Sequence, residues 1–209
     1  MTTHLLFIRH ARSTWNELNR WQGQADPPLS ETGLAEAHRL AQRLCQSNGL
    51  SIAHVYASDL QRAATTAGVV ANALGLPLTL DPIWRERGIG ELEGLTTEEI
   101  IRDYPDFWAS RHSGPMHAPG GEGVEAVMRR AALGCERLLA RHTDEAVIVV
   151  SHGGMILATL VHVLGLGPTA FATLVGGKHT AISEVKIEDG HARLERLNDH
   201  AHLEWLPSA

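Results

Sequence analysis

The chain has little of what marks secreted and membrane proteins. Its 209 residues include two cysteines, Cys45 and Cys135. Both fall on expected helix faces, where we expect buried thiols, and two are too few for a disulfide framework. Their scarcity favours a reducing cytoplasm. The longest mostly apolar stretch, 155–164, is too short to span a bilayer. The first apolar run is followed at once by Arg9, which does not fit a signal peptide.

The chain also lacks an excess of positive charge. It has 18 Lys and Arg against 24 Asp and Glu, a formal net charge of −6. This balance argues against a nucleic-acid partner, whereas a small anion needs only a local cluster of arginine and histidine. The 13 histidines raise the alternative of a metallohydrolase. Because no His-x-x-x-His or Cys/His spacing supports a metal site, we expect neither a metal nor another cofactor.

What the chain does contain is an alternation of strands and helices. Apolar or β-branched runs predict strands, and apolar residues at helical spacing predict helices. This alternation predicts an α/β fold, a three-layer α/β/α sandwich around a mostly parallel, mixed sheet. The helix at 155–164 is apolar nearly all round and should be buried. The expected strands are 5–8, 52–57, 78–80, 146–150, 181–187 and 192–197, the last two forming a hairpin at Asp189-Gly190, and the other helices are 30–45, 60–74 and 124–141.

The stretch from 84 to 123 differs in composition from the rest, with many glycine, arginine and histidine residues. It has too little apolar periodicity for a core of its own. We therefore expect one domain over 1–209, with 84–123 as a small cap inserted above the sheet.

Two expected strands end in a histidine. His10 and Arg9 close the first, and His152 follows the strand at 146–150. If only the first strand is considered, Arg9 is best explained as a solvated strand end and His10 as a structural histidine. Because the carboxyl ends of parallel strands form the ligand-binding edge of an α/β sheet, the second histidine favours a shared site.

Two further residues fit a site for a phosphoryl group. Arg62 lies in the first turn of the helix at 60–74, beside free N–H groups that attract anions. A surface arginine explains that position equally well. Glu86 is most simply a surface partner of Arg85 or Arg87, but a carboxyl beside a phosphate would carry a proton and act as a general acid. We therefore expect a pocket for a phosphoryl group, formed by two arginines, two histidines and a helix N-terminus.

Six short motifs occur in order along the chain: Arg9-His10-Ala11 with Ser13-Thr14-Trp15-Asn16, Leu29-Ser30-x-x-Gly33, Ser58-Asp59-Leu60-x-Arg62-Ala63, Arg85-Glu86 with Gly90-x-Leu92-Glu93-Gly94, Gly120-Gly121-Glu122, and Val149-x-Ser151-His152-Gly153-Gly154. Each is weak alone. Together, from Leu5 to about Leu164, they closely resemble the histidine phosphatase superfamily, in the branch of the cofactor-dependent phosphoglycerate mutases and related phosphatases.

The resemblance implies how the chemistry is divided. His10 would be the nucleophile and form a phosphohistidine. Glu86 would protonate the leaving oxygen and then activate the water that hydrolyses the intermediate. Covalent catalysis of this kind divides one difficult step into two easier ones.

The resemblance also implies which residues bind the phosphoryl oxygens. Arg9, Arg62 and His152 would hold them and neutralise charge in the transition state, acting as catalytic residues with His10 and Glu86. The Asn16 amide and the Gly153 N–H would add donors. No metal is needed in this scheme, because the arginines supply the positive charge.

The chain departs from the family pattern at three positions. Ala11 stands where glycine is usual after the nucleophile, and its methyl is tolerated if φ is negative. Arg12 stands where glutamate is common, which adds positive charge near the entrance. Gly123 replaces a common serine. None of these changes removes a group that the chemistry requires.

The compact cap and short tail favour a phosphatase over a mutase, which would shield its phosphoenzyme from water. Mutase-type phosphoryl transfer is the alternative, and a non-catalytic phospho-ligand-binding protein is the second alternative. We expect a small phosphorylated substrate, such as a phosphosugar, phosphoglycerate ester or nucleoside phosphate. A homodimer is a further expectation, and we expect no nucleic-acid or membrane partner. The candidates for substrate specificity, all equally open to packing or solvation, are Arg12, Trp21, Gln22, Gln24, Arg87, Trp108, Arg111 and His112.

Overall fold

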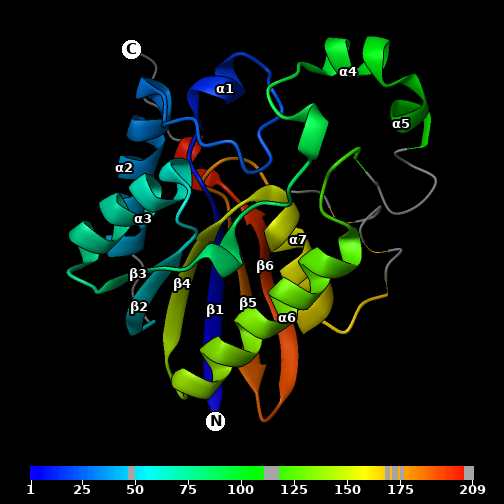
Figure 1. Ribbon diagram of the computed structural model, residues 1–209. Helices are drawn as coiled ribbons and strands as arrows, with labels where there is room; N and C mark the ends of the chain where they lie inside the picture. Colours follow the sequence, from blue (N-terminus) through cyan, green and yellow to red (C-terminus); the bar gives the residue numbers. More distant parts are fainter. Residues whose placement is uncertain (47–49, 111–117, 168–169, 171–173, 175–176, 205–209) are drawn as a thin grey trace.

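The computed structural model describes residues 1–46, 50–110, 118–167, 170, 174 and 177–204. Within these residues, six strands form one sheet in the order β3-β2-β4-β1-β5-β6 (Figure 1). The first four in this order run parallel, and β5 and β6 are antiparallel to their neighbours. This confirms the expected mixed, mostly parallel sheet. The strands are β1 (Thr2–Arg9), β2 (Ile52–Ala57), β3 (Leu78–Leu80), β4 (Ala146–Ser151), β5 (Ile182–Glu188) and β6 (His191–Asp199).

Helices cover both faces of the sheet, as Figure 1 shows. α2 (Glu31–Gln46) and α3 (Gln61–Leu74) lie on one face, and α6 (Val124–Arg141) and α7 (Gly153–Val163) lie on the other. Alternate residues of β1 serve the two layers, because successive side chains in a strand point to opposite faces. Leu6 and Ile8 pack in the layer of α2 and α3, whereas Leu5 and Phe7 pack in the layer of α6 and α7.

Two helices, α6 and α7, agree with the expectations from sequence periodicity. α6 runs from Val124 to Arg141, as predicted, and α7 is buried along most of its length, although it begins at Gly153. The hairpin between β5 and β6 turns at Asp189 and Gly190, which both have positive φ. This is the backbone of a tight type I′ turn.

The prediction for Cys45 is wrong. Cys45 lies in the last turn of α2 and is exposed, whereas Cys135 in α6 is buried. Burial raises the pKa of the Cys135 thiol to about 12, so this group is an inert apolar side chain.

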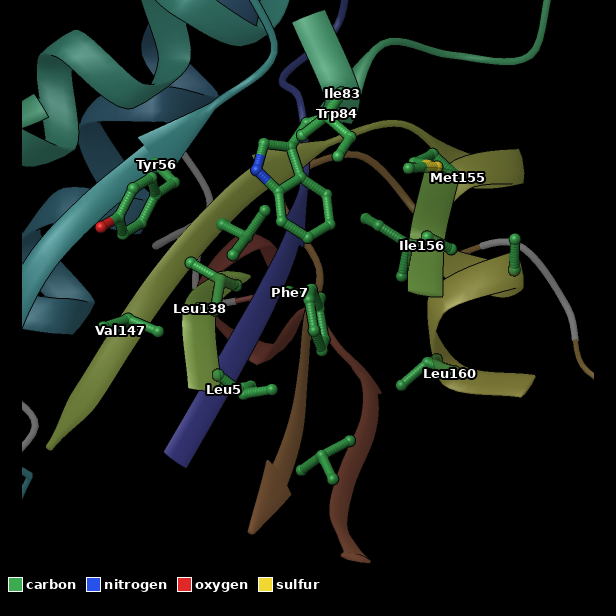
Figure 2. Packing of buried hydrophobic residues seen from close by; sticks show 14 of the residues in the cluster. Leu5, Phe7, Tyr56, Ile83, Trp84, Leu138, Val147, Met155, Ile156 and Leu160 are labelled. Carbon is green, nitrogen blue, oxygen red and sulfur yellow. The ribbon is translucent and has the colours of Figure 1, made fainter. Parts of the chain in front are cut away.

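The segment that leads to Glu86 is anchored in the layer of α6 and α7. Trp84, at the end of a short 3-10 turn (η1, Pro82–Trp84), is only 2 % exposed and packs near Phe7 and Ile83 (Figure 2). Its ring centroid lies 6.4 Å from that of Phe7. The buried Ser151 hydroxyl donates to the Trp84 carbonyl at 2.7 Å. The next residues therefore leave this anchor beside the carboxyl end of β4.

The cap region contains α4 (Thr97–Asp103) and α5 (Pro105–Ser110), and Figure 1 shows both away from the sheet. Despite the weak periodicity, four residues form a buried cluster there: Leu92, Ile100, Phe107 and Ala118. A single domain with a cap insertion stays a prediction. A short α1 (Thr14–Glu17) lies between β1 and α2, and η2 (Gly90–Leu92) precedes α4.

In the part of the chain that the structure describes, none of the helices combines the length and apolarity required to cross a membrane.

A glycine at the start of α2 sets how closely this helix approaches the loop after β1. A Cβ added at Gly33 would lie 1.8 Å from the Arg12 carbonyl oxygen, whereas one added at Gly68 within α3 would meet nothing within 4 Å. We predict that Gly33→Ala lowers the free energy of unfolding by about 1–3 kcal/mol. Gly68→Ala should raise it by up to about 1 kcal/mol, because alanine favours helix. Urea unfolding measures both, and equal stability of the two variants would contradict the described backbone contact.

Candidate active site

The pairing of β1 with β4 brings the two predicted histidines together. Arg9 pairs with Ser151 in register, and the next N–H, that of His10, donates to the Ser151 carbonyl at 2.9 Å. His152 follows Ser151 directly. The two imidazole centroids are 5.1 Å apart, and both rings are buried.

His10 is held in one tautomer. Its Nδ1 lies 2.7 Å from the Ala11 carbonyl oxygen, and a carbonyl can only accept. Nδ1 therefore carries the proton, and Nε2 keeps a free lone pair in the neutral ring. The pKa of His10 is lowered well below its ordinary value, first by burial and then by His152, Arg62 and Arg9. A neutral imidazole with a directed lone pair is a competent nucleophile.

Arg62 is buried in the first turn of α3, with only 1 % of its surface exposed. Its Nη1 and Nη2 donate to the carbonyls of Ala25 and Gly23, each at 2.7 Å. Its Nε is buried and has no hydrogen-bond partner in the part of the chain that the structure describes. Burial lowers the pKa of Arg62 to about 10, so it is still charged at neutral pH. Of the two positions that the sequence left open for Arg62, the structure has the interior one. That Arg62 binds a phosphoryl group stays a prediction.

Arg9 and His152 also carry buried groups without partners. Arg9 donates from Nη1 to the Gly177 carbonyl at 2.7 Å, but its Nε has no partner among the described residues. The same residues offer no partner to either ring nitrogen of His152. Burial, Arg62 and Arg9 lower the pKa of His152, so its ring is neutral and offers one N–H. Unpaired buried donors around a cationic centre are what an anion would satisfy.

Glu86 lies at the same edge of the sheet. Its carboxylate accepts from the N–H groups of Gly154 at 3.1 Å and Met155 at 3.2 Å, in the first turn of α7. It also accepts from the Arg87 N–H at 2.8 Å. Of the two surface partners that the local sequence suggested for Glu86, Arg85 instead forms a two-point ion pair with Asp59 at 2.6 and 2.7 Å.

One residue that positions Glu86 was missed by the sequence analysis. Arg130 of α6 donates to both carboxylate oxygens of Glu122, at 2.8 and 2.7 Å. It also donates to the carbonyls of Ile83 and Arg85 at 2.9 Å and of Glu86 at 3.3 Å. Arg130 therefore ties the loop that carries Glu86 to the Gly-Gly-Glu motif. The one sequence signal near Arg130 was this motif, which contains its ion-pair partner Glu122 but not Arg130 itself.

The two remaining predicted phosphate donors are placed differently. Gly153 is the first residue of α7, directly after His152. Asn16 lies in α1, where its amide oxygen accepts from the Ser13 N–H at 3.0 Å, which leaves the amide nitrogen to donate. That both groups bind a phosphoryl group stays a prediction.

Two of the specificity candidates pack in the cap. Trp21 meets Phe107 edge-on, with ring centroids 6.2 Å apart, and its Nε1 donates to the Thr97 hydroxyl at 3.1 Å. Trp108 packs against the same cluster. Both tryptophans therefore have structural contacts in the cap, and their contact with a substrate stays a prediction.

Three further specificity candidates, Gln22, Gln24 and Arg87, lie in loops outside the sheet. Gln22 Oε1 lies 2.9 Å from the Ser13 hydroxyl, and the Gln24 amide donates to the Glu86 carbonyl at 3.1 Å. Arg87 donates from Nε to the Glu122 carbonyl at 2.9 Å and has a buried Nη2 without a partner. Arg111 and His112 lie outside the described residues.

The two departures from the family pattern after His10 are accommodated. Ala11 is fully buried, its φ is not positive, and its N–H donates to the Thr66 hydroxyl at 3.0 Å. Its methyl therefore causes no backbone strain. Arg12 extends outward, and the buried Glu36 accepts from its backbone N–H at 2.9 Å and lies 3.4 Å from its Nε.

A third histidine, His179, lies beside His10, and no motif in the sequence pointed to it. The two ring centroids are 5.7 Å apart. Its Nε2 is buried, and no described residue forms a hydrogen bond with it. Burial, together with Arg9 and Arg12, lowers the pKa of His179 to about 3. The arrangement as a whole is a buried cluster of cationic side chains with a neutral nucleophile and one carboxyl group, which suits attack on a phosphate ester.

No three His, Cys, Asp or Glu side chains in the described ranges are grouped to hold a metal ion. That the reaction needs no metal stays a prediction.

Comparison with known proteins gives one consistent result. The family model described as "Histidine phosphatase superfamily (branch 1)" matches residues 5–200. A metal-independent phosphoserine phosphatase of Arabidopsis thaliana is 33% identical over 205 residues, covering 96% of this chain and 83% of the relative. A probable phosphoglycerate mutase GpmB of Yersinia pestis is 31% identical over 207 residues, covering 94% and 93%. A mycobacterial glucosyl-3-phosphoglycerate phosphatase in complex with VO3 superimposes with a TM-score of 0.86 at 29% identity, covering 94% of this chain and 99% of that one.

The buried neutral histidines make a prediction about acid stability. The unfolded chain takes up protons on histidine below the ordinary pKa of 6.5, whereas folded His10 does not. The free energy of unfolding should therefore fall as the pH drops below about 6.5, by up to about 1.4 kcal/mol per pH unit for each such histidine. In phosphate-free buffer, His10→Gln should reduce this loss between pH 7.5 and 5.5.

The matched control is His38→Gln, which removes an exposed histidine of α2. It should keep the acid sensitivity of the parent protein. Thermal or urea unfolding at several pH values gives the comparison. If His10→Gln and the parent lose stability in parallel, His10 is not neutral in the folded protein.

Proposed function

The chain belongs to the histidine phosphatase superfamily, branch 1, and on that basis we propose that it is a phosphomonoester hydrolase that works through a phosphohistidine. One observation carries this proposal. The bond from His10 Nδ1 to the Ala11 carbonyl, at 2.7 Å, leaves the lone pair of Nε2 for the nucleophilic attack, beside Arg9 and Arg62.

The first step forms the covalent intermediate. His10 Nε2 attacks phosphorus, the N–P bond forms, and the bond from phosphorus to the ester oxygen breaks. Glu86, entering with a proton, gives it to that oxygen, so the alcohol leaves neutral. Arg9, Arg62 and His152 donate to the three equatorial oxygens, where charge accumulates.

The second step returns the enzyme to its starting state. The Glu86 carboxylate accepts a proton from water as the water oxygen attacks phosphorus. The N–P bond breaks, inorganic phosphate forms, and the lone pair returns to His10 Nε2. The N–H groups of Gly154 and Met155 hold the Glu86 carboxylate at this edge of the sheet. Arg130 holds the loop that carries Glu86 by donating to the Glu86 carbonyl.

Hydrolysis is favoured over mutase-type transfer because the cap of this chain is small. Relatives carry names of both kinds, phosphoserine phosphatase and probable phosphoglycerate mutase. A non-catalytic binding protein would have no need for Glu86, which is present together with every other group that the two steps use. The substrate class we propose is a small phosphorylated metabolite. We also propose a cytoplasmic location, from the few cysteines, and a homodimer stays a prediction.

The nucleophile is tested by substitution. We predict that His10→Ala lowers hydrolysis of p-nitrophenyl phosphate by more than about 1000-fold, because no other group takes over the covalent step. Phosphate release is the measurement, with circular dichroism to show that the variant folds. Unchanged activity would exclude His10 as the nucleophile.

The same assay addresses the alternatives. Full activity in a chelator is expected, because the arginines supply the positive charge. With 3-phosphoglycerate as substrate, inorganic phosphate should appear, and 2-phosphoglycerate should not. Formation of 2-phosphoglycerate as the main product would identify a mutase. Phosphate binding without turnover of any phosphate ester would identify a binding protein.

The proton donor is tested by changing the leaving group. We predict that Glu86→Gln lowers kcat by about 10²- to 10⁴-fold with an alkyl phosphate. The loss should be much smaller with p-nitrophenyl phosphate, because p-nitrophenolate leaves without a proton. Equal losses with both esters would contradict the assignment.

Gly154→Ala should show the same leaving-group pattern without removing the carboxyl group. The added Cβ would lie 2.6 Å from Glu86 Oε1 and would displace it. The matched variant is Gly153→Ala, whose Cβ would lie 3.8 Å from the nearest Arg9 atoms, an ordinary contact. Its dependence on the leaving group should be weaker than that of Gly154→Ala.

A further inference from the structure

A cationic cavity lies next to the cluster of side chains around His10. It has a volume of about 360 Å³ and is lined by Arg9, Arg12, Lys178, His179 and Asn198, among others. The lining comes from the end of β1, the segment before β5, and the end of β6. Arg9 belongs to both places, whereas His10, Arg62, Glu86 and His152 do not line this cavity.

The charge of this cavity has one sign. Arg9, Arg12 and Lys178 line it, and no acidic residue is among its described lining. Glu36, which does not line the cavity, lies with its Oε1 3.4 Å from the Arg12 Nε and so offsets part of the positive charge of Arg12. Because the chain is acidic overall, this concentration of cations is local.

The cavity also has a polar atom that no described residue satisfies. The Nε2 of His179, which lines the cavity, is buried and has no hydrogen-bond partner in the described part of the chain. Buried polar groups are normally paired, and an orphan group implies an absent partner. The walls are fixed, because the Lys178 N–H donates to the Asn198 side chain at 2.7 Å and Arg9 Nη1 donates to the Gly177 carbonyl at 2.7 Å.

We propose that this cavity is a second anion-binding site, which takes a carboxylate or a phosphoryl group between Arg12, Lys178 and His179. Its volume is at the lower end of that of small-molecule sites and has room for such a group with bound water. The group comes from one of two sources. It is either a free anion or, if the proposed hydrolase function holds, the second anionic group of the substrate itself. His179 is neutral in the empty cavity, and a bound anion would favour its protonation.

The test has a binding part that needs no turnover. Isothermal titration with inorganic phosphate should give two sites per chain, one in each pocket. Arg12→Gln and Lys178→Gln should each weaken the second site by about 10- to 100-fold, because each removes a charge-assisted hydrogen bond. The matched control is Lys186→Gln on β5, whose ammonium lies 3.0 Å from Glu188 and away from the cavity, and it should keep both sites.

The catalytic part distinguishes the two sources. 3-Phosphoglycerate and glycerol 3-phosphate differ by a carboxylate, so the ratio of their kcat/KM values reports on a second anionic group. If the substrate supplies the anion, Lys178→Gln and Arg12→Gln should lower this ratio about tenfold. If a free anion binds, the ratio should stay constant while the second phosphate site is lost.

One result overturns the proposal. This is a single phosphate site per chain, with affinity and substrate ratio unchanged in both variants. An absence of phosphatase activity would refute the proposed function alone, because the titration still reports on the cavity.

Discussion

The parallel pairing of β1 with β4 is the contact on which the rest of the site depends. It sets Arg9 opposite Ser151, so the next residue of each strand is a histidine, and the two rings stand 5.1 Å apart. A slip of one residue would turn one strand over relative to the other and move its apolar residues to the opposite helix layer. The burial of β1 and β4 between two helix layers therefore fixes the register and, with it, the position of His10.

Around this contact the protein buries more positive charge than it neutralises. Arg62 and Arg9 are held by carbonyl groups of neighbouring loops, and Glu86 is the carboxyl group that acts most strongly on both. Desolvated cations without full compensation destabilise the empty protein, and an anion relieves that cost. The same surroundings keep His10 neutral. One arrangement thus accounts for both the affinity for a phosphoryl group and the reactivity of the nucleophile.

The sequence predicted those parts that follow from periodicity or from local motifs. Strands, the long helices and the edge where His10 and His152 meet all follow from apolar patterns that are read along the chain. Arg130 and His179 could not be found this way, because one reaches the Glu86 loop from another helix and the other lies in an unmarked turn before β5. Cys45 was misplaced because helical spacing near a helix end does not determine which side meets solvent. Asn16 and Gly153 depend on a bound group for their roles, which apolar patterns do not describe.

The central claim is that the phosphoryl group passes through His10 Nε2. Rapid mixing of the protein with ³²P-labelled substrate, followed by alkaline quenching within one turnover, tests this most directly. The account predicts phosphate that is stable in alkali and labile in acid, bound to the peptide that carries His10. Turnover with inorganic phosphate as product and no covalently bound phosphate at any mixing time would contradict it.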